Sequence, residues 1–122
     1  MEGIEDKRVL IIEDNALIGA MIADAIVEAG GRPIGPALSE REALGLIEHS
    51  LNMPDVAVLD VGLDVKGFRV AAKLLEHGIP FVFATGSAGD IPAEYSNVPI
   101  CSKPYTPNDL IRALSGAMRP FS

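Results

Sequence analysis

Each of four short apolar runs in this sequence is followed at once by polar residues. Apolar runs of this length are typical of the buried strands of a parallel sheet. The carboxyl ends of parallel strands lie at one edge of the sheet, where open α/β sheets bind their ligands. We therefore expect these polar residues to converge at one place: Glu13-Asp14, Asp60, Thr85-Gly86 and Lys103-Pro104.

The apolar runs alternate with amphipathic helical patterns, which predicts an α/β fold with a parallel sheet between two layers of helices. We expect helices after the capping residues Asn15, Ser39 and Thr106, and a further helix after Gly67. The connection between Thr85 and Lys103 is short and rich in glycine and proline, so its helix should be short or mobile.

Prolines indicate which strands lie at the edges of the sheet. Pro33 and Pro36 fall in the second run and Pro99 falls in the fifth. Because proline cannot donate a hydrogen bond to a neighbouring strand, an edge strand tolerates it best. With right-handed crossovers, the natural strand order is 2-1-3-4-5. The direction of winding then reverses between the strands that end at Asp14 and Asp60, where a ligand is expected.

The composition fits one compact domain of 122 residues, 48% of them hydrophobic. The net charge of −7 and the scattered basic residues argue against nucleic acid or anionic lipid, and favour proteins and metal cations as partners. No apolar run is long enough to span a bilayer, the acidic start does not resemble a signal peptide, and the single cysteine fits a reducing compartment. These features predict a soluble cytoplasmic protein.

The residue types at the strand ends predict phosphoryl chemistry. Three crowded carboxylates repel one another unless a cation shares their site, and hard oxygen ligands suit Mg²⁺. Asp60 is the candidate nucleophile toward a phosphoryl group. Lys103 would supply a fixed positive charge and Thr85 a hydrogen bond. Gly62 and Gly86 would leave room for the incoming group.

Each of these residues also has an ordinary structural interpretation. Glu13-Asp14 would favour the start of the first helix, Asp60 suits a turn, Thr85 is a common strand residue and Lys103 suits a solvated surface. The joint occurrence at four successive strand ends, at workable spacings, favours the functional interpretation.

The chain resembles the receiver domain of bacterial two-component response regulators, on Ile12-Glu13-Asp14-Asn15, Leu59-Asp60-Val61, Ala84-Thr85-Gly86 and Lys103-Pro104-Tyr105. The resemblance covers residues 8–118 and implies one receiver domain, residues 1–122, with a flavodoxin-like (βα)5 fold. It implies phosphorylation of Asp60 by a histidine kinase or phosphotransfer protein. It also implies direct Mg²⁺ ligation by Asp14, Asp60 and the Gly62 carbonyl, with Glu13 acting mostly through water, and a cis bond before Pro104.

Two departures from this family pattern bear on how the domain switches. The family usually has an aromatic residue three positions before the lysine, and this chain has Ile100. The segment after Thr85 lacks a firm helix, and Phe83-Ala84-Thr85-Gly86 is similar to a receiver subgroup common among stand-alone receivers. We therefore hypothesise that phosphorylation orders residues 86–97.

We expect a signalling domain that promotes only its own phosphorylation and slow hydrolysis, and acts through contacts with an unknown downstream protein. A hydrolase with an aspartyl-phosphate intermediate is the first alternative. It is disfavoured because such enzymes place a general acid two positions after the nucleophile, where this chain has Gly62. A receiver that only docks to partners is the second alternative. The cognate kinase, the signal, the target, and the choice between sink, relay and allosteric partner stay open.

Overall fold

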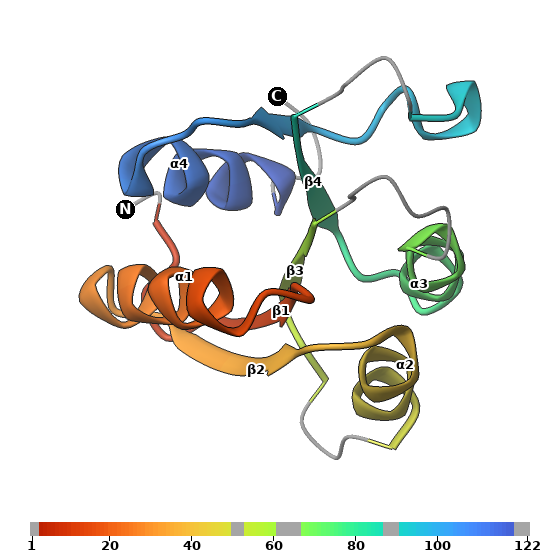
Figure 1. Ribbon diagram of the computed structural model, residues 1–122, viewed down its shortest axis with the longest axis horizontal. Coiled ribbons are helices and arrows are strands. Elements are labelled where there is room, and N and C mark those ends of the chain that lie inside the picture. Colours follow the sequence, from red (N-terminus) through yellow and green to blue (C-terminus); the bar gives the residue numbers. More distant parts are fainter. Residues whose placement is uncertain (1–2, 50–52, 61–66, 87–90, 119–122) are drawn as a thin grey trace.

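A computed structural model describes residues 3–49, 53–60, 67–86 and 91–118. The described residues form a five-stranded sheet of order β2-β1-β3-β4-β5, in which every neighbouring pair is parallel, so the predicted fold class is confirmed (Figure 1). The strands are β1 (Arg8–Ile12), β2 (Arg32–Ala37), β3 (Val56–Asp60), β4 (Phe81–Thr85) and β5 (Ile100–Ser102). The helices are α1 (Ala16–Glu28), α2 (Glu40–His49), α3 (Gly67–Glu76) and α4 (Pro107–Ala117), with a 3₁₀ helix η2 (Ala93–Tyr95).

The sheet separates two hydrophobic layers, because successive residues of a strand face opposite sides. Val9 and Ile11 of β1 pack with α1 and α4, whereas Leu10 and Ile12 pack with α2 and α3. Figure 1 shows these two pairs of helices on opposite sides of the strands. The central strands are buried on both faces, which explains why their sequences are continuously apolar.

The prolines lie at the edges of the sheet, as predicted. Pro33 and Pro36 are in β2, whose register shifts beside a Gly35 with φ of +94°. Pro99 lies just before β5 rather than inside it, and its carbonyl accepts a hydrogen bond from Phe83 of β4. Each edge strand thus places its prolines where the missing N–H donor does little harm.

Capping contacts at Asn15, Ser39 and Thr106 confirm the predicted helix starts. The Asn15 side chain accepts from the Ile18 N–H at 3.0 Å, and Thr106 and Asp109 form a complete capping box. Ser39 forms only half of one: its hydroxyl accepts from the Glu42 N–H at 3.1 Å. The Glu42 carboxylate instead accepts from the N–H of Leu38, at 3.4 Å.

The connection between β4 and β5 contains only the three-residue η2 among its described residues, which confirms the expected short fourth helix. In Figure 1, η2 lies above α3, and the chain returns from it to β5. None of the helices in the described ranges has the length and apolar character needed to cross a membrane.

Candidate functional site

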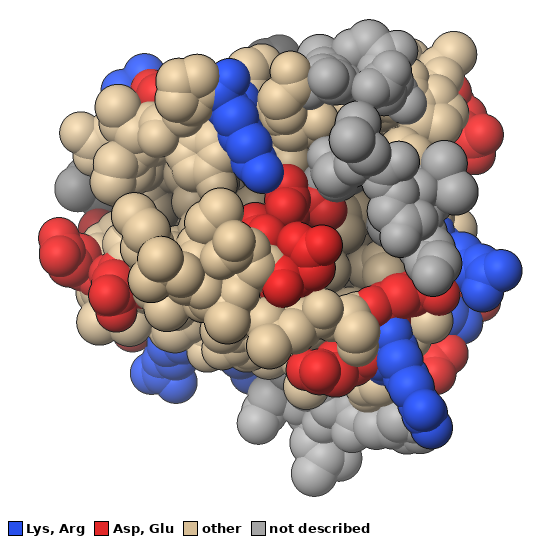
Figure 2. Space-filling model, viewed as in Figure 1, with Lys and Arg blue, Asp and Glu red and all other residues tan. Residues whose placement is uncertain are grey.

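Three carboxylates meet where β1 and β3 end. Ile12 of β1 pairs with Leu59 of β3, so the next residues along the chain, Glu13 after β1 and Asp60 at the end of β3, lie side by side at this edge of the sheet. Ligand oxygens of Glu13, Asp14 and Asp60 all lie within 4.8 Å of one another; we call these three residues the acid cluster. Figure 2 shows acidic side chains gathered at the centre of this face, next to one basic side chain. The convergence predicted from the strand ends is therefore present.

Lys103 completes the group from the other side. Its Nζ lies 2.7 Å from Asp60 Oδ1, and the Asp60 side chain is only 9% exposed. The Lys103 N–H donates to the Thr85 carbonyl at 2.9 Å, which ties the residue to the end of β4. The Lys103-Pro104 peptide bond is cis, as the family resemblance implied. The ammonium is thus held beside the candidate nucleophile by the backbone that follows β5.

Thr85 lies at the end of β4 and is 3% exposed. The register pairs Asp60 of β3 with Ala84, so Thr85 follows one position beyond Asp60 at the same sheet edge. The next residue, Gly86, is exposed, and a Cβ built on it would meet no described atom within 4 Å. A small hydroxyl and open space therefore adjoin the acid cluster. Gly62, the other predicted glycine and metal ligand, lies outside the described residues.

Glu13 is the most perturbed member of the acid cluster. Its side chain is 2% exposed, and Oε2 accepts from the Asn15 N–H at 3.0 Å. Its Oε1 is buried and has no hydrogen-bond partner among the described residues. Burial first, and then the close carboxyl–carboxyl approach to Asp60, raise the pKa of Glu13 to about 7. A hydrogen bond between two carboxyl groups requires a proton on one of them. Without a bound cation, the acid cluster therefore favours the protonated form of Glu13.

The acid cluster fits a small divalent cation. The oxygen ligands of Mg²⁺ lie at about 2.0–2.1 Å from the metal, so two opposite ligands are about 4 Å apart. The oxygens here span 4.8 Å at most, and the unpartnered Glu13 Oε1 is a buried acceptor that a cation would satisfy. Glu13, Asp14 and Asp60 are the described residues that would hold such an ion.

Two aromatic residues were given no role by the sequence: Tyr105, which appeared only as part of the Lys103-Pro104-Tyr105 motif, and Tyr95. Tyr105 is partly buried, and burial, followed by the charges of Cys101, Glu13 and Asp60, raises the pKa of Tyr105 to about 12. Tyr95 is buried in η2, whereas Ile100 of β5 is 39% exposed and supplies no ring. The helical spacing of Ile91, Tyr95 and Val98 was the available signal for Tyr95, within a segment that had suggested only loop.

Comparison with known proteins identifies a regulatory relative. No protein-family model matches the sequence. The chain is 32% identical over 121 residues to the transcriptional regulatory protein PdtaR of two Mycobacterium tuberculosis strains. The match covers 94% of this chain and 58% of each relative, so the chain spans little more than half of their length.

Solved structures give a consistent result for the fold. The chemotaxis protein CheY4 of Vibrio cholerae matches with a TM-score of 0.74 and 22% identity, over 92% of this chain and 98% of that one. The receiver domain of the Erythrobacter litoralis response regulator PhyR matches with a TM-score of 0.77 and 22% identity, over 97% of each chain.

The sheet order and these structural matches show that the chain has the fold of response regulator receiver domains. The sequence match adds similarity to part of a transcriptional regulatory protein.

Proposed function

We propose that this chain is a phosphoacceptor signalling domain, which takes a phosphoryl group onto Asp60 in a Mg²⁺-dependent reaction. The donor would be a sensor histidine kinase or a histidine phosphotransfer protein. The observation that carries the proposal is the 2.7 Å contact between Lys103 Nζ and Asp60 Oδ1, beside two further carboxylates. The receiver fold and the regulatory relative support it.

Each residue of the site would have a separate role in the phosphoryl transfer. An Asp60 carboxylate oxygen attacks phosphorus, the bond to the donor's histidine nitrogen breaks, and an acyl phosphate forms. Lys103 Nζ moves from the carboxylate to the phosphoryl oxygens and offsets their charge. Thr85 donates its hydroxyl to the same group, and the open space beside Gly86 admits it. Mg²⁺, held by the acid cluster, would supply the charge neutralisation that in-line phosphoryl transfer requires.

The signal would leave through protein contacts. The chain is acidic, with a net charge of −7, and on the face shown in Figure 2 the described basic side chains are scattered rather than gathered into a patch for nucleic acid. One chain would accept one phosphoryl group and release it slowly, without the turnover of an enzyme. The relative PdtaR is called a transcriptional regulatory protein, and this chain matches 58% of it, so we propose that a separate protein segment or partner supplies the output.

Incubation with acetyl phosphate and Mg²⁺ tests the proposal. Intact-mass spectrometry should show the addition of one phosphoryl group, which chelation of Mg²⁺ prevents and mild hydroxylamine removes, because acyl phosphates react with it. No addition would favour a receiver that only docks to partners. Steady release of phosphate from an aryl phosphate would favour the hydrolase alternative instead.

A further inference from the structure

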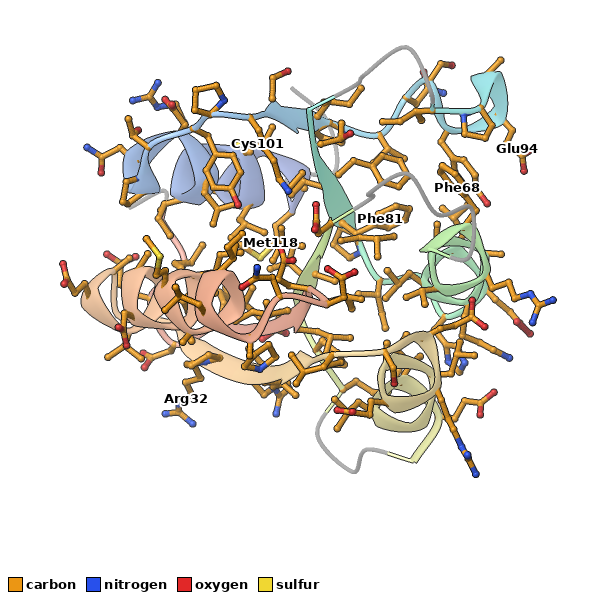
Figure 3. The ribbon with its side chains drawn as sticks, in the orientation of Figure 1. Arg32, Phe68, Phe81, Glu94, Cys101 and Met118 are labelled. Carbon is orange, nitrogen blue, oxygen red and sulfur yellow. The ribbon has the colours of Figure 1, made fainter. Side chains whose placement is uncertain are left out.

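The connection between β4 and β5 is held by one buried aromatic side chain. Tyr95 of η2 is 5% exposed. Its ring stacks on Phe68 of α3, with centroids 5.7 Å apart and planes at 13°. It meets Phe83 of β4 edge-on at 5.8 Å and 77°. In Figure 3, Phe68 lies between α3 and η2, whereas Glu94, the neighbour of Tyr95 in η2, points outward. Tyr95 therefore joins η2 to both α3 and β4.

The polar atoms of Tyr95 fix the same arrangement. Its hydroxyl donates to the Phe68 carbonyl at 3.4 Å. Its N–H donates to the Pro92 carbonyl, and its carbonyl accepts from the Val98 N–H, each at 3.0 Å. Ile91 and Val98 pack against the same hydrophobic layer. These contacts tie residues 91–98 to the Tyr95 side chain. We call the ring seated when it packs between Phe68 and Phe83, and we expect the position of residues 91–98 to depend on that packing.

Both ring contacts of Tyr95 belong to elements that are close in sequence to residues of the phosphoryl site. Phe83 lies two residues before Thr85 in β4, so the two side chains leave the strand on the same face. Phe68 is in the first turn of α3, the helix that follows Asp60 in the chain. Interiors are close-packed, so a shift of the Thr85 end of β4 or of the start of α3 changes the space available to the ring.

We propose that Tyr95 is a positioning residue that links the phosphorylation of Asp60 to the position of residues 91–98. The link rests on the function proposed above. The phosphoryl group adds about −1.5 to −2 charges at Asp60 and draws Thr85 and Lys103 toward it. In this proposal the arrangement of β4 and α3 around the phosphoryl group favours the seated Tyr95 ring over the unseated one, so phosphorylation increases the fraction of molecules in which the ring is seated. Coupling is reciprocal, so the seated ring also strengthens binding of the phosphoryl group.

Ile100 of β5 pairs with Phe83, but its side chain is aliphatic and 39% exposed. In the described part of the connection and of β5, the ring that contacts Phe83 is that of Tyr95. The proposed link therefore runs through η2 rather than through β5.

Beryllofluoride with Mg²⁺, a mimic of the phosphoryl group, provides the test on the full chain. Its affinity is measured by ¹⁹F NMR titration, and backbone protection of residues 91–98 by amide hydrogen exchange. In the unaltered chain, beryllofluoride should increase protection of this segment. Tyr95→Leu should lose that increase and bind beryllofluoride about tenfold more weakly, a typical coupling. Tyr95→Phe keeps the ring and should retain most of both effects.

Phe81→Leu is the matched control. Phe81 is 3% exposed and packs edge-on against Phe83 at 5.4 Å, but it begins β4, at the end remote from Thr85. This variant should lose stability yet keep both the affinity and the protection response. If Tyr95→Leu behaves like Phe81→Leu, Tyr95 is only a core residue and the proposal is overturned.

Three further outcomes are also decisive. If Tyr95→Leu does not fold, Phe68→Leu removes the stacking partner and should reproduce its loss of response; a normal response in Phe68→Leu overturns the link. If the unaltered chain binds no beryllofluoride, the proposed function fails and the link fails with it. Binding without any change in protection overturns the link alone.

Discussion

The acid cluster and the ring cluster of Phe68, Phe81, Phe83 and Tyr95 lie close together but are stabilised very differently. In the acid cluster, a buried carboxyl oxygen has no partner among the described residues, and carboxylates crowd within 4.8 Å. In the ring cluster, every ring has an edge-on or stacked aromatic neighbour, and the Tyr95 hydroxyl has an acceptor. The first region is poor in stabilising contacts and the second is rich in them.

This difference shows how a small domain combines reactivity with a stable fold. Carboxylates that repel one another lie together where a bound cation would relieve their repulsion. Aromatic rings a few residues away provide dispersion and burial that offset the loss. Substitutions in the acid cluster should therefore reduce function while sparing or raising stability. Substitutions in the ring cluster should lower stability, and those at Tyr95 and Phe68 should also weaken the response to beryllofluoride.

Asp60→Asn should have the largest effect. Asn keeps the shape of the side chain but removes the nucleophilic charge, so labelling by acetyl phosphate should fall by more than about a thousandfold. The fold should persist, because the acid cluster loses one of its repelling charges. Intact-mass spectrometry measures the labelling and circular dichroism the fold. Phosphorylation of the Asp60→Asn variant at a normal rate would show that Asp60 is wrongly assigned.

Phe83→Ala should cause the largest loss of stability. Phe83 is fully buried and contacts the rings of Phe68, Phe81 and Tyr95. Removing a buried phenyl ring leaves a cavity and costs about 3–5 kcal/mol of the free energy of unfolding. Urea unfolding measures it, with Phe68→Ala as the control, since Phe68 is only partly buried. A loss below about 1 kcal/mol in Phe83→Ala would remove the contrast between the two clusters.

Glu13→Gln should stabilise the metal-free protein above pH 7. The pKa of Glu13 is raised from 4.5 to about 7 in the folded protein. The unfolded chain therefore releases this proton at lower pH than the folded one. Stability contributed by protonated Glu13 is fully present below pH 4.5, declines between pH 4.5 and 7, and is absent above. Gln is neutral throughout, so we expect a gain of about 2 kcal/mol at pH 8.

The pH series itself separates this effect from general charge reduction. Urea unfolding of the unaltered chain without metal should show a decline in stability from pH 5 to pH 8, and the Glu13→Gln variant should lack most of it. Asp14→Asn is the control, because Asp14 belongs to the acid cluster but is exposed. If the free energy of unfolding changes equally with pH in the unaltered chain and in the Glu13→Gln variant, Glu13 is not the residue whose raised pKa lowers the stability.

The sequence was sufficient to predict the frame that carries the acid cluster. Pro33, Pro36 and Pro99 marked the edge strands, and local hydrogen-bonding rules then left one natural strand order. Once the order is known, residues that follow β1 and β3 must meet, because adjacent parallel strands end at the same edge. The proximity of Asp14 to Asp60 is thus a consequence of topology, which a pattern of short apolar runs reveals.

The packing of the ring cluster could not be predicted in the same way. Tyr95 is seated by contacts with residues about 12 and 27 positions away, and no local rule fixes such contacts. The half capping box at Ser39 is a similar case, since the sequence allowed Glu42 to reach Ser39 and the fold directs it to Leu38. The local sequence predicts which groups can form hydrogen bonds or apolar contacts, and tertiary packing determines which partners they contact.

Mg²⁺ should give the smallest of these effects, and it tests whether the strain in the acid cluster is there to be relieved by a cation. At a free concentration ten times the dissociation constant, a ligand that binds only the folded state stabilises it by about 1.4 kcal/mol, or roughly 5 °C in melting temperature for a domain of this size.

Glu13→Gln should reduce the shift in melting temperature, because it removes one ligand charge. Asp24→Asn, an exposed acid on α1 outside the cluster, should leave the shift unchanged. Melting curves at matched ionic strength exclude simple screening of the net charge of −7, and equal shifts in all three proteins would mean that the cation binds elsewhere.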